Sequence, residues 1–259
     1  MKVPTWLPDS LQRKLRTIYY RGDAFHCPFC GFKGRALSPI GFDLPVLVEK
    51  QVSGAGRRNA GCFNCGIIDR ERLVHVYLRD VLHIYDRLPS SRILHIAPDE
   101  HITGFLSRSN VLEYVCGDKF TEGYVYPKHV VDLDIQHLPF SSDHFDLVIC
   151  NHVLEHVPDD AGAMRELLRV LKPGGHAVLQ VPLSANMPTT FEDPAIVDPK
   201  ERERLYGQFD HVRLYGQDYG DRLRAAGFTV ERLQLARRKE FERYGLNPAE
   251  DLFVGVKPS

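Results

Sequence analysis

The stretch that decides the fold is residues 134–157, which read DIQHLPFSSDHFDLVICNHVLEHV. Within it, residues 145–150 are a short apolar run of the kind that forms a buried strand. Similar runs stand at residues 91–98, 112–117 and 177–181, and helical patterns separate them. This alternation of strand and helix signals predicts a doubly wound, mostly parallel sheet. Ligands of such sheets bind at the carboxyl ends of the strands, so the residues that follow each strand are candidate site residues.

The overall composition is that of an ordinary globular protein. Of 259 residues, 43% are hydrophobic and 26% are charged, and this length suits one α/β domain with a smaller module. No apolar run is long enough to span a bilayer, and the first ten residues lack the apolar core of a signal peptide. We therefore expect a cytoplasmic protein that does not bind membranes. Its oligomeric state is left open.

Two near-copies of one short motif stand in the first third of the chain, CPFCG at residues 27–31 and CFNCG at residues 62–66. In each, a Cys-x-x-Cys turn brings two sulfurs to one side, and the glycine allows the backbone to bend beneath them. In a reducing compartment, paired cysteines hold metal more often than they form disulfides. The motifs therefore predict a closed, structural zinc site formed by Cys27, Cys30, Cys62 and Cys65.

The cysteine motifs also suggest how the chain is divided. We expect residues 1–88 to form a zinc-ribbon-like module with a linking helix, and residues 89–259 to form the α/β domain. The 31 residues between Cys30 and Cys62 exceed what a compact ribbon needs and include the loop GAGRR, which predicts a hairpin insertion. Apolar residues at helical spacing over residues 67–85, closed by Pro89, predict the linking helix.

Residues 134–157, together with LLRVLKPGG at residues 167–175, resemble the central signature of small class I S-adenosylmethionine-dependent methyltransferases. The resemblance extends over residues 91–233. It implies a Rossmann-like, mostly parallel seven-stranded sheet, with residues 228–233 and 252–256 as the antiparallel pair at its edge. It also implies an enzyme that uses S-adenosyl-L-methionine as its methyl donor.

The family pattern assigns cofactor roles to residues that follow the strands. Asp118, at the end of the second strand, is placed to accept hydrogen bonds from both ribose hydroxyls, as a carboxylate does in related dinucleotide folds. Asp134 matches the position that accepts from the adenine amino group, and Ile135 would pack on the base. Asn151 and His152 should border the methionine portion and the sulfonium.

The loop after the first strand departs from the family pattern. Family members carry an acidic residue and a glycine-rich turn there, whereas this chain reads HIAPDE at residues 95–100. Ala97 is small enough to let the backbone approach the ligand, and Pro98 removes one amide donor and restricts the turn. Both are expected to line the cofactor site.

Related enzymes cover the acceptor with an insertion after the fifth strand, which corresponds here to about residues 183–215. A His-x-Arg-x-Tyr element near its end supplies the candidate acceptor-binding residues Asp210, His211, Arg213 and Tyr215. As an alternative, His211 and Arg213 would tie the insertion to the sheet. His152 and His211 are the candidate bases for an acceptor that must lose a proton.

Residues 152–156, HVLEH, also fit the His-x-x-Glu-His pattern of inverted zinc peptidases. They directly follow a buried strand, and LEHV is common in the methyltransferase signature. The methyltransferase interpretation is therefore favoured, and no catalytic metal is assigned.

The leading functional hypothesis is O- or N-methyl transfer to a small molecule or glycan precursor by direct displacement. The chain shows no interleaving of aromatic and basic residues of the kind that binds RNA bases. The rival hypothesis is an rRNA or tRNA methyltransferase whose zinc module grips RNA, because residues 1–75 hold 12 Lys and Arg against 6 Asp and Glu. A third is a non-catalytic cofactor- or partner-binding protein on a degenerate methyltransferase fold, motivated by the altered first loop.

Overall fold

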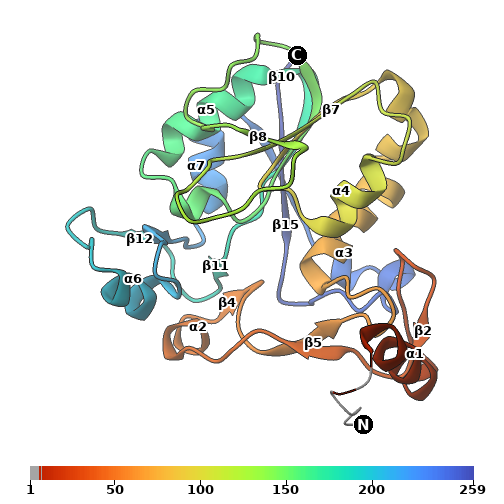
Figure 1. Cartoon of the computed structure of the whole chain (residues 1–259). Helices are drawn as coiled ribbons and strands as arrows, with labels where there is room; N and C mark the ends of the chain where they lie inside the picture. Colours follow the sequence, from red (N-terminus) through yellow and green to blue (C-terminus); the bar gives the residue numbers. More distant parts are fainter. Residues whose placement is uncertain (1–5, 7) are drawn as a thin grey trace.

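The computed structural model describes residue 6 and residues 8–259. Its centre is one large sheet made of β6 (Arg92–Ile96), β7 (Glu113–Asp118), β8 (Val130–Asp132), β9 (Phe145–Cys150), β10 (Leu171–Val178), β14 (Thr229–Leu233) and β15 (Leu252–Val256). The strand order is β14-β15-β10-β9-β6-β7-β8 (Figure 1). Strand β15 runs antiparallel to β10 and β14, and the other neighbours are parallel. The expected α/β fold with a mostly parallel seven-stranded sheet is confirmed, and so is the antiparallel pair at its edge.

The order of the strands reverses between β6 and β9. From β6 the chain continues to β7 and β8 on one side, whereas β9 and β10 lie on the other side. The connections therefore leave these two strands in opposite directions, and a crevice opens outside their carboxyl ends. Ile96 and Cys150 are paired at those ends, so the residues that follow them meet at the crevice.

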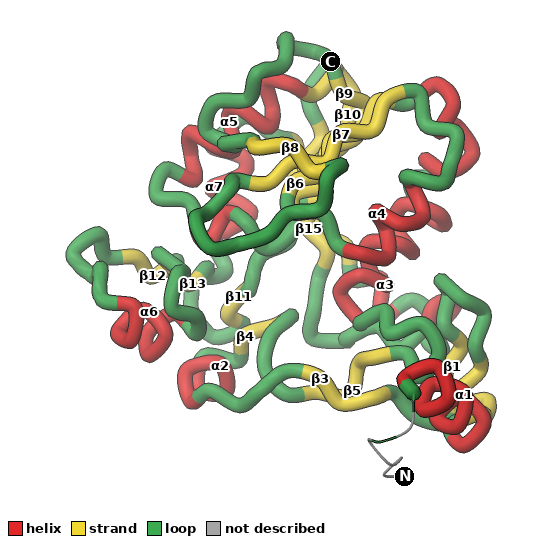
Figure 2. The backbone as a smooth tube through the Cα atoms, viewed as in Figure 1, coloured by secondary structure: helices red, strands yellow, loops and turns green. Residues whose placement is uncertain are grey.

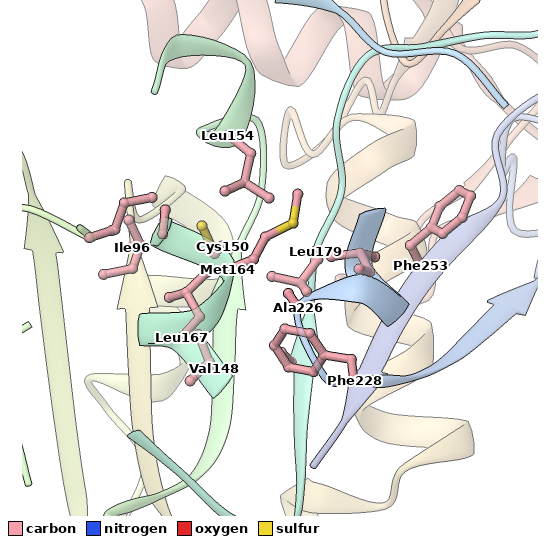
Figure 3. Packing of buried hydrophobic residues seen from close by; sticks show 14 of the residues in the cluster. Ile96, Val148, Cys150, Leu154, Met164, Leu167, Leu179, Ala226, Phe228 and Phe253 are labelled. Carbon is pink, nitrogen blue, oxygen red and sulfur yellow. The ribbon is translucent and has the colours of Figure 1, made fainter. Parts of the chain in front are cut away.

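Helices cover both faces of the sheet. Helices α5 (Asp160–Val170) and α7 (Tyr219–Ala225) pack on one face, and α3 (Asp69–Val76) and α4 (Glu100–Leu106) pack on the other. Figure 3 shows Met164 and Leu167 of α5 beside Val148 and Cys150 of β9. Burial on both faces explains why the strands read as nearly continuous apolar runs.

The predicted linking helix is not continuous. Helix α3 passes into a π-type turn at Tyr77–Val81, and His83 then adopts a left-handed φ of 53°. A 3-10 segment, Ile84–Ser90, follows and contains Pro89. The left-handed residue interrupts the helical hydrogen bonds, yet the apolar residues Tyr77, Leu78 and Ile84 still pack beneath the sheet. Apolar spacing therefore predicted the burial of this segment but not its shape.

The module before α3 consists of short elements joined by loops (Figure 2). Its buried apolar cluster around the cysteine motifs is small, so a cross-link such as a metal ion is needed to hold it. Strand β1 pairs with β2, and β3 pairs antiparallel with β5. Helix α2 and strand β4 lie between β3 and β5, so the segment between the motifs is not the simple hairpin that the sequence predicted. The elements are α1 (Asp9–Tyr19), β1 (Arg21–His26), β2 (Lys33–Gly34), β3 (Ser38–Ile40), α2 (Pro45–Glu49), β4 (Val52–Ser53) and β5 (Arg58–Gly61).

The module is joined to the insertion that follows β10. Strand β4 pairs with β11 (Leu183–Ser184), and α2 lies beside α6 (Pro199–Tyr206) (Figure 1). Within the insertion, β12 (Phe191–Glu192) pairs with β13 (Arg213–Leu214). One apolar cluster crosses this boundary and contains Val46, Leu47, Val52, Tyr206 and Leu214. Two segments far apart in the sequence therefore form one structural unit below the sheet.

Residues 1–5 and residue 7, part of the start that was read as lacking a signal peptide, lie outside the described residues. Over the part of the chain that the structure describes, no helix is long and apolar enough to cross a membrane. The cytoplasmic location stays a prediction.

Candidate functional site

The four predicted zinc ligands come together in space. The Sγ atoms of Cys27 and Cys65 are 3.8 Å apart, and so are those of Cys30 and Cys62. Four thiolates at a Zn–S distance of about 2.3 Å in a tetrahedron lie about 3.8 Å from one another. None of the four cysteines forms a disulfide within the described residues. The cluster therefore has the donor set and the spacing of a closed zinc site.

Both cysteine motifs fold in the same way. The amide of Gly31 donates to the carbonyl of Cys27 at 3.0 Å, and the amide of Gly66 donates to that of Cys62 at 2.9 Å. The two glycines have φ angles of 72° and 87°, a left-handed conformation that glycine adopts at little cost. The glycines noted in the sequence are therefore required by the turns that present the sulfurs.

A buried arginine connects the cysteine cluster to the rest of the protein. Arg72 of α3 is 0% exposed and donates to the carbonyl oxygens of Ala60, Ile67 and Gly245. Its positive charge lies near the thiolates, with which it interacts favourably. A tetrathiolate zinc site carries net negative charge, so this cation offsets part of the cost of burying it.

A pocket of about 720 Å³, here named the strand-end pocket, opens at the carboxyl ends of β6, β7 and β9. This volume suits a small organic ligand. Five of the predicted cofactor residues line it, namely Ala97, Asp118, Asp134, Ile135 and His152.

Two residues at the strand-end pocket have a left-handed backbone. Ala97 follows β6 with φ 46°, and His152 follows β9 with φ 56°. The amide of Ala97 donates to the carbonyl of Gly117, and that of His152 donates to the carbonyl of Gln180, both at 2.8 Å. Such conformations cost on the order of 1–3 kcal/mol in non-glycine residues and concentrate at functional sites. Ala97 thus supplies a turn that glycine would adopt more easily.

Two carboxylates stand on the β7 and β8 side of the strand-end pocket. Burial raises the pKa of Asp118 above its usual value. Partial burial works in the same direction on Asp134, but hydrogen bonds from Lys119 and Gln136 outweigh it and lower the pKa of this carboxyl. Ile135 is buried next to Asp134. This wall therefore offers acceptors for ligand hydroxyl or amino groups beside an apolar surface.

A second pocket of about 500 Å³, here named the module pocket, lies between the module and the domain. Gly54 and Arg70 line it from the module side, and His211 lines it from the insertion. His152 and His156 line both pockets, so the two pockets meet at these histidines. The cysteine cluster therefore stabilises a module that forms one wall of this pocket.

Two arginines, Arg58 of β5 and Arg70 of α3, lie near the start of helix α3 and differ in their partners. Arg58 donates to both carboxylate oxygens of Asp69, at 2.6 and 2.8 Å. The Arg70 side chain, in contrast, forms no hydrogen bond or ion pair with the residues described. Arg70 therefore presents a cation to the module pocket, with the Glu250 carboxyl near enough to interact with its charge.

A cluster of Glu155, His156 and His211 lies where the pockets meet, and the ligand-type atoms of these residues are within 4.8 Å of one another. Burial would raise the pKa of Glu155, but the neighbouring histidines, His152 foremost, lower it overall. Burial lowers the pKa of His152 and of His211. The pKa of the Glu155 carboxyl is therefore lowered, as is that of the His211 imidazole beside it.

Arg213 and Tyr215 do not reach either pocket, contrary to the expected acceptor role. Arg213 is 3% exposed and donates to three carbonyl oxygens of residues 154–158. Tyr215 is buried and donates from its hydroxyl to Asp160 at 2.7 Å. Both side chains tie the insertion to the loop after β9, which was the alternative interpretation for Arg213.

Two residues that were predicted to bind the cofactor, Pro98 and Asn151, do not line the strand-end pocket. Pro98 lines a neighbouring hollow that shares Asp118 with the strand-end pocket. Asn151 lines neither named pocket, and its side-chain oxygen accepts from the amide of Gln180 at 3.3 Å. Asp210, which was predicted to bind the acceptor, lines the strand-end pocket and not the module pocket.

Glu155, His156, Gln208 and Arg70 line the pockets but were not predicted as site residues. The HVLEH segment did signal Glu155 and His156, although it was read only as part of the methyltransferase signature. Nothing in the local sequence of Arg70 or Gln208 points to a pocket, because tertiary packing alone brings them there.

Replacing one cysteine of the cluster should release its metal ion. We expect Cys62→Ala to lower the zinc content of the purified protein by one equivalent per chain and to expose the module to proteolysis, because structural zinc supplies folding energy. Elemental analysis and limited proteolysis measure both effects. Cys116→Ala, which removes a buried cysteine of β7, is the matched control. Unchanged zinc in Cys62→Ala would rule out this site.

Replacing Arg213 should weaken folding rather than acceptor binding. Arg213→Met leaves three carbonyl oxygens without their donor, so we expect the free energy of unfolding to fall by about 3 kcal/mol in urea titration. Arg224→Met, which removes an exposed pair with Asp221, should cost at most about 1 kcal/mol. Unchanged stability combined with weaker acceptor binding would restore Arg213 as an acceptor residue.

Known proteins resemble part of this chain. The family described as "Methyltransferase domain" matches residues 97–179. Demethylmenaquinone methyltransferase of Listeria monocytogenes serotype 4a (strain HCC23) is 38% identical over 80 residues, which cover 31% of this chain and 33% of that protein. The ubiquinone/menaquinone biosynthesis C-methyltransferase UbiE of Vibrio vulnificus (strain YJ016) is 36% identical over 72 residues, 27% of this chain and 28% of that protein. The chain thus spans about a third of the length of the curated relatives it matches.

Among solved structures, the YcgJ protein of Bacillus subtilis superimposes with a TM-score of 0.43 at 17% identity, over 68% of this chain and 97% of that one. The family match is the more specific finding. It includes Asp118, Asp134 and His152 but neither the cysteine cluster nor the insertion. Residues 97–179 therefore match a methyltransferase domain family, and a four-cysteine cluster precedes this part of the chain.

Proposed function

We propose that this protein methylates a small molecule, with S-adenosylmethionine bound in the strand-end pocket and the acceptor bound in the module pocket. The observation that carries the proposal is that the two pockets meet at His152 and His156. Methyl transfer by direct displacement requires the acceptor atom in line with the methyl group and water excluded, which adjoining pockets permit. The cofactor supplies the methyl carbon on a sulfonium.

The residues that line the strand-end pocket fit the parts of this cofactor. Asp118 is positioned to accept from the ribose hydroxyls, and Asp134 is positioned to accept from the adenine amino group. Ile135 offers an apolar surface for the base. Ala97 and His152 border the remaining side, toward the module pocket.

The neutral histidines suit an acceptor that must lose a proton. Because burial lowers the pKa of His152 and His211, each keeps a lone pair at neutral pH and is a candidate base for a hydroxyl or ammonium acceptor. The name of the Vibrio relative describes C-methylation. The module and the insertion lie outside the matched residues 97–179, so we infer the acceptor class from the module pocket itself.

A small acceptor is favoured over RNA by the pairing of the module's arginines. Arg57 is paired with Asp43 and Arg58 with Asp69, so part of the basic excess counted in the sequence is neutralised. The volume of the module pocket also suits a small molecule. Arg70 favours an acceptor that carries a phosphate or a carboxylate, as a phosphorylated glycan precursor does.

Removing the Asp118 carboxylate should impair cofactor binding. We expect Asp118→Ala to weaken S-adenosylmethionine binding by about 10- to 100-fold in calorimetry, because hydrogen bonds to a charged group contribute about 1.5–3 kcal/mol. Asp132→Ala, which removes an exposed carboxylate of β8, should bind as the wild type does. Equal affinity in Asp118→Ala would reject the assigned cofactor site. No binding by the wild-type protein would favour the non-catalytic alternative.

Removing the Arg70 charge should impair the use of anionic acceptors. In a screen of methyl acceptors, we expect Arg70→Met to raise KM for phosphate- or carboxylate-bearing compounds by about tenfold or more, and to leave the Kd for S-adenosylmethionine unchanged. Arg57→Met, in an exposed pair on the module, is the control. Salt-sensitive methylation of RNA without turnover of small molecules would instead support the RNA alternative.

A further inference from the structure

The cluster at the junction of the pockets draws on two distant parts of the chain. Glu155 and His156 lie in a short 3-10 turn after β9, and His211 comes from the end of the insertion. His152 is not a member of the cluster, so the arrangement differs from the peptidase pattern considered for HVLEH. Glu155 and His211 are buried, and His156 is half-buried and lines both pockets.

One nitrogen of each histidine faces an oxygen of the protein. Nδ1 of His211 lies 3.2 Å from the carbonyl oxygen of Tyr206, and Nδ1 of His156 lies 3.3 Å from a carboxylate oxygen of Asp210. With Nδ1 engaged in this way, Nε2 of each ring is the nitrogen left for a ligand. A histidine whose second nitrogen donates to a carbonyl or carboxylate is the usual outer arrangement of a metal ligand.

The carboxylate of Glu155 is not satisfied by the protein. Its residue is 1% exposed, and Oε2 has no hydrogen-bond partner in the described part of the chain. Its other oxygen, Oε1, lies 3.6 Å from Nδ1 of His152. An unpartnered buried carboxylate oxygen is costly. A cation bound by this oxygen and by one ring nitrogen of each histidine would satisfy it, and the three ligand-type atoms are close enough to share one ion.

We propose that Glu155, His156 and His211 bind a divalent transition-metal ion whose open coordination positions face the module pocket. Two imidazoles and one carboxylate form the ligand set of open zinc sites and of non-haem iron sites, whereas magnesium and calcium prefer oxygen ligands. This site is separate from the closed cysteine cluster, which leaves no position free for a ligand.

The catalytic role of the ion rests on the proposed function. An acceptor hydroxyl bound to the ion releases its proton to solvent at neutral pH, as metal-bound water does. The acceptor oxygen then attacks the methyl carbon, an O–C bond forms, and the C–S bond breaks with its electron pair staying on sulfur. The products are the methylated acceptor, S-adenosylhomocysteine and the released proton.

Binding of Co²⁺ alone tests the site without any assay of activity. The full-length protein is dialysed against a moderate chelator and titrated with Co²⁺, whose d–d absorption without a thiolate charge-transfer band reports nitrogen and oxygen ligands. We expect one such equivalent per chain in the wild type. Glu155→Gln and His211→Asn should lower the affinity by at least about 100-fold, and Asp210→Asn by about 10- to 100-fold through loss of the orienting carboxylate.

His144→Gln is the matched control, because His144 forms a similar pair with Glu113, at 2.9 Å, away from the pockets. It should bind Co²⁺ as the wild type does. Circular dichroism and thermal unfolding show which variants are folded. The Asp210 side chain is 43% exposed, so its variant is the decisive one if both ligand variants unfold. Absence of this Co²⁺ signal in the wild type, or equal affinity in the folded variants, would overturn the proposal. Co²⁺ binding without S-adenosylmethionine binding would leave the metal site standing and reject the proposed function.

Discussion

The parallel pairing of β6 with β9 is the constraint on which the rest of the site depends. The pair ends at Ile96 and Cys150, and beyond it the chain turns away on opposite sides of the sheet. The turns that follow are compact and left-handed at Ala97 and His152, and backbone hydrogen bonds to β7 and to the end of β10 hold them. Because both turns are fixed by the sheet, the strand-end pocket has rigid walls at the point where chemistry is proposed.

The cysteine cluster acts at a distance from that point. A closed tetrathiolate site has no open position, so its contribution is to hold loops that have little apolar core of their own. Those loops pair with the insertion through β4 and β11 and share an apolar cluster with it. The loops and the insertion therefore stabilise one another, and together they form one side of the module pocket.

Buried polar groups separate the structural parts of this junction from the functional parts. Arg213 and Tyr215 are buried with hydrogen-bond partners, as structural polar groups are. Glu155 is buried with one oxygen unpartnered, next to His156 and His211. A buried polar atom without a hydrogen-bond partner destabilises the fold, and such atoms are found where an ion or ligand binds. The presence or absence of hydrogen-bond partners thus distinguishes Arg213, which holds the insertion, from Glu155, which faces the pockets.

The sequence by itself predicted the four-cysteine cluster from the spacing of its motifs, and the α/β fold from the alternation of strand and helix signals, although it did not mark strand β8. The resemblance to the methyltransferase signature singled out Asp118, Asp134 and His152, which line the strand-end pocket. The sequence could not show the break in the linking helix at His83, since apolar spacing reports burial and not backbone conformation. Only the tertiary structure decided that the module walls a pocket, that Arg213 turns into the core, and that His211 meets Glu155. Those outcomes depend on the pairing of β4 with β11 and on packing between segments far apart in the chain, which no local pattern encodes.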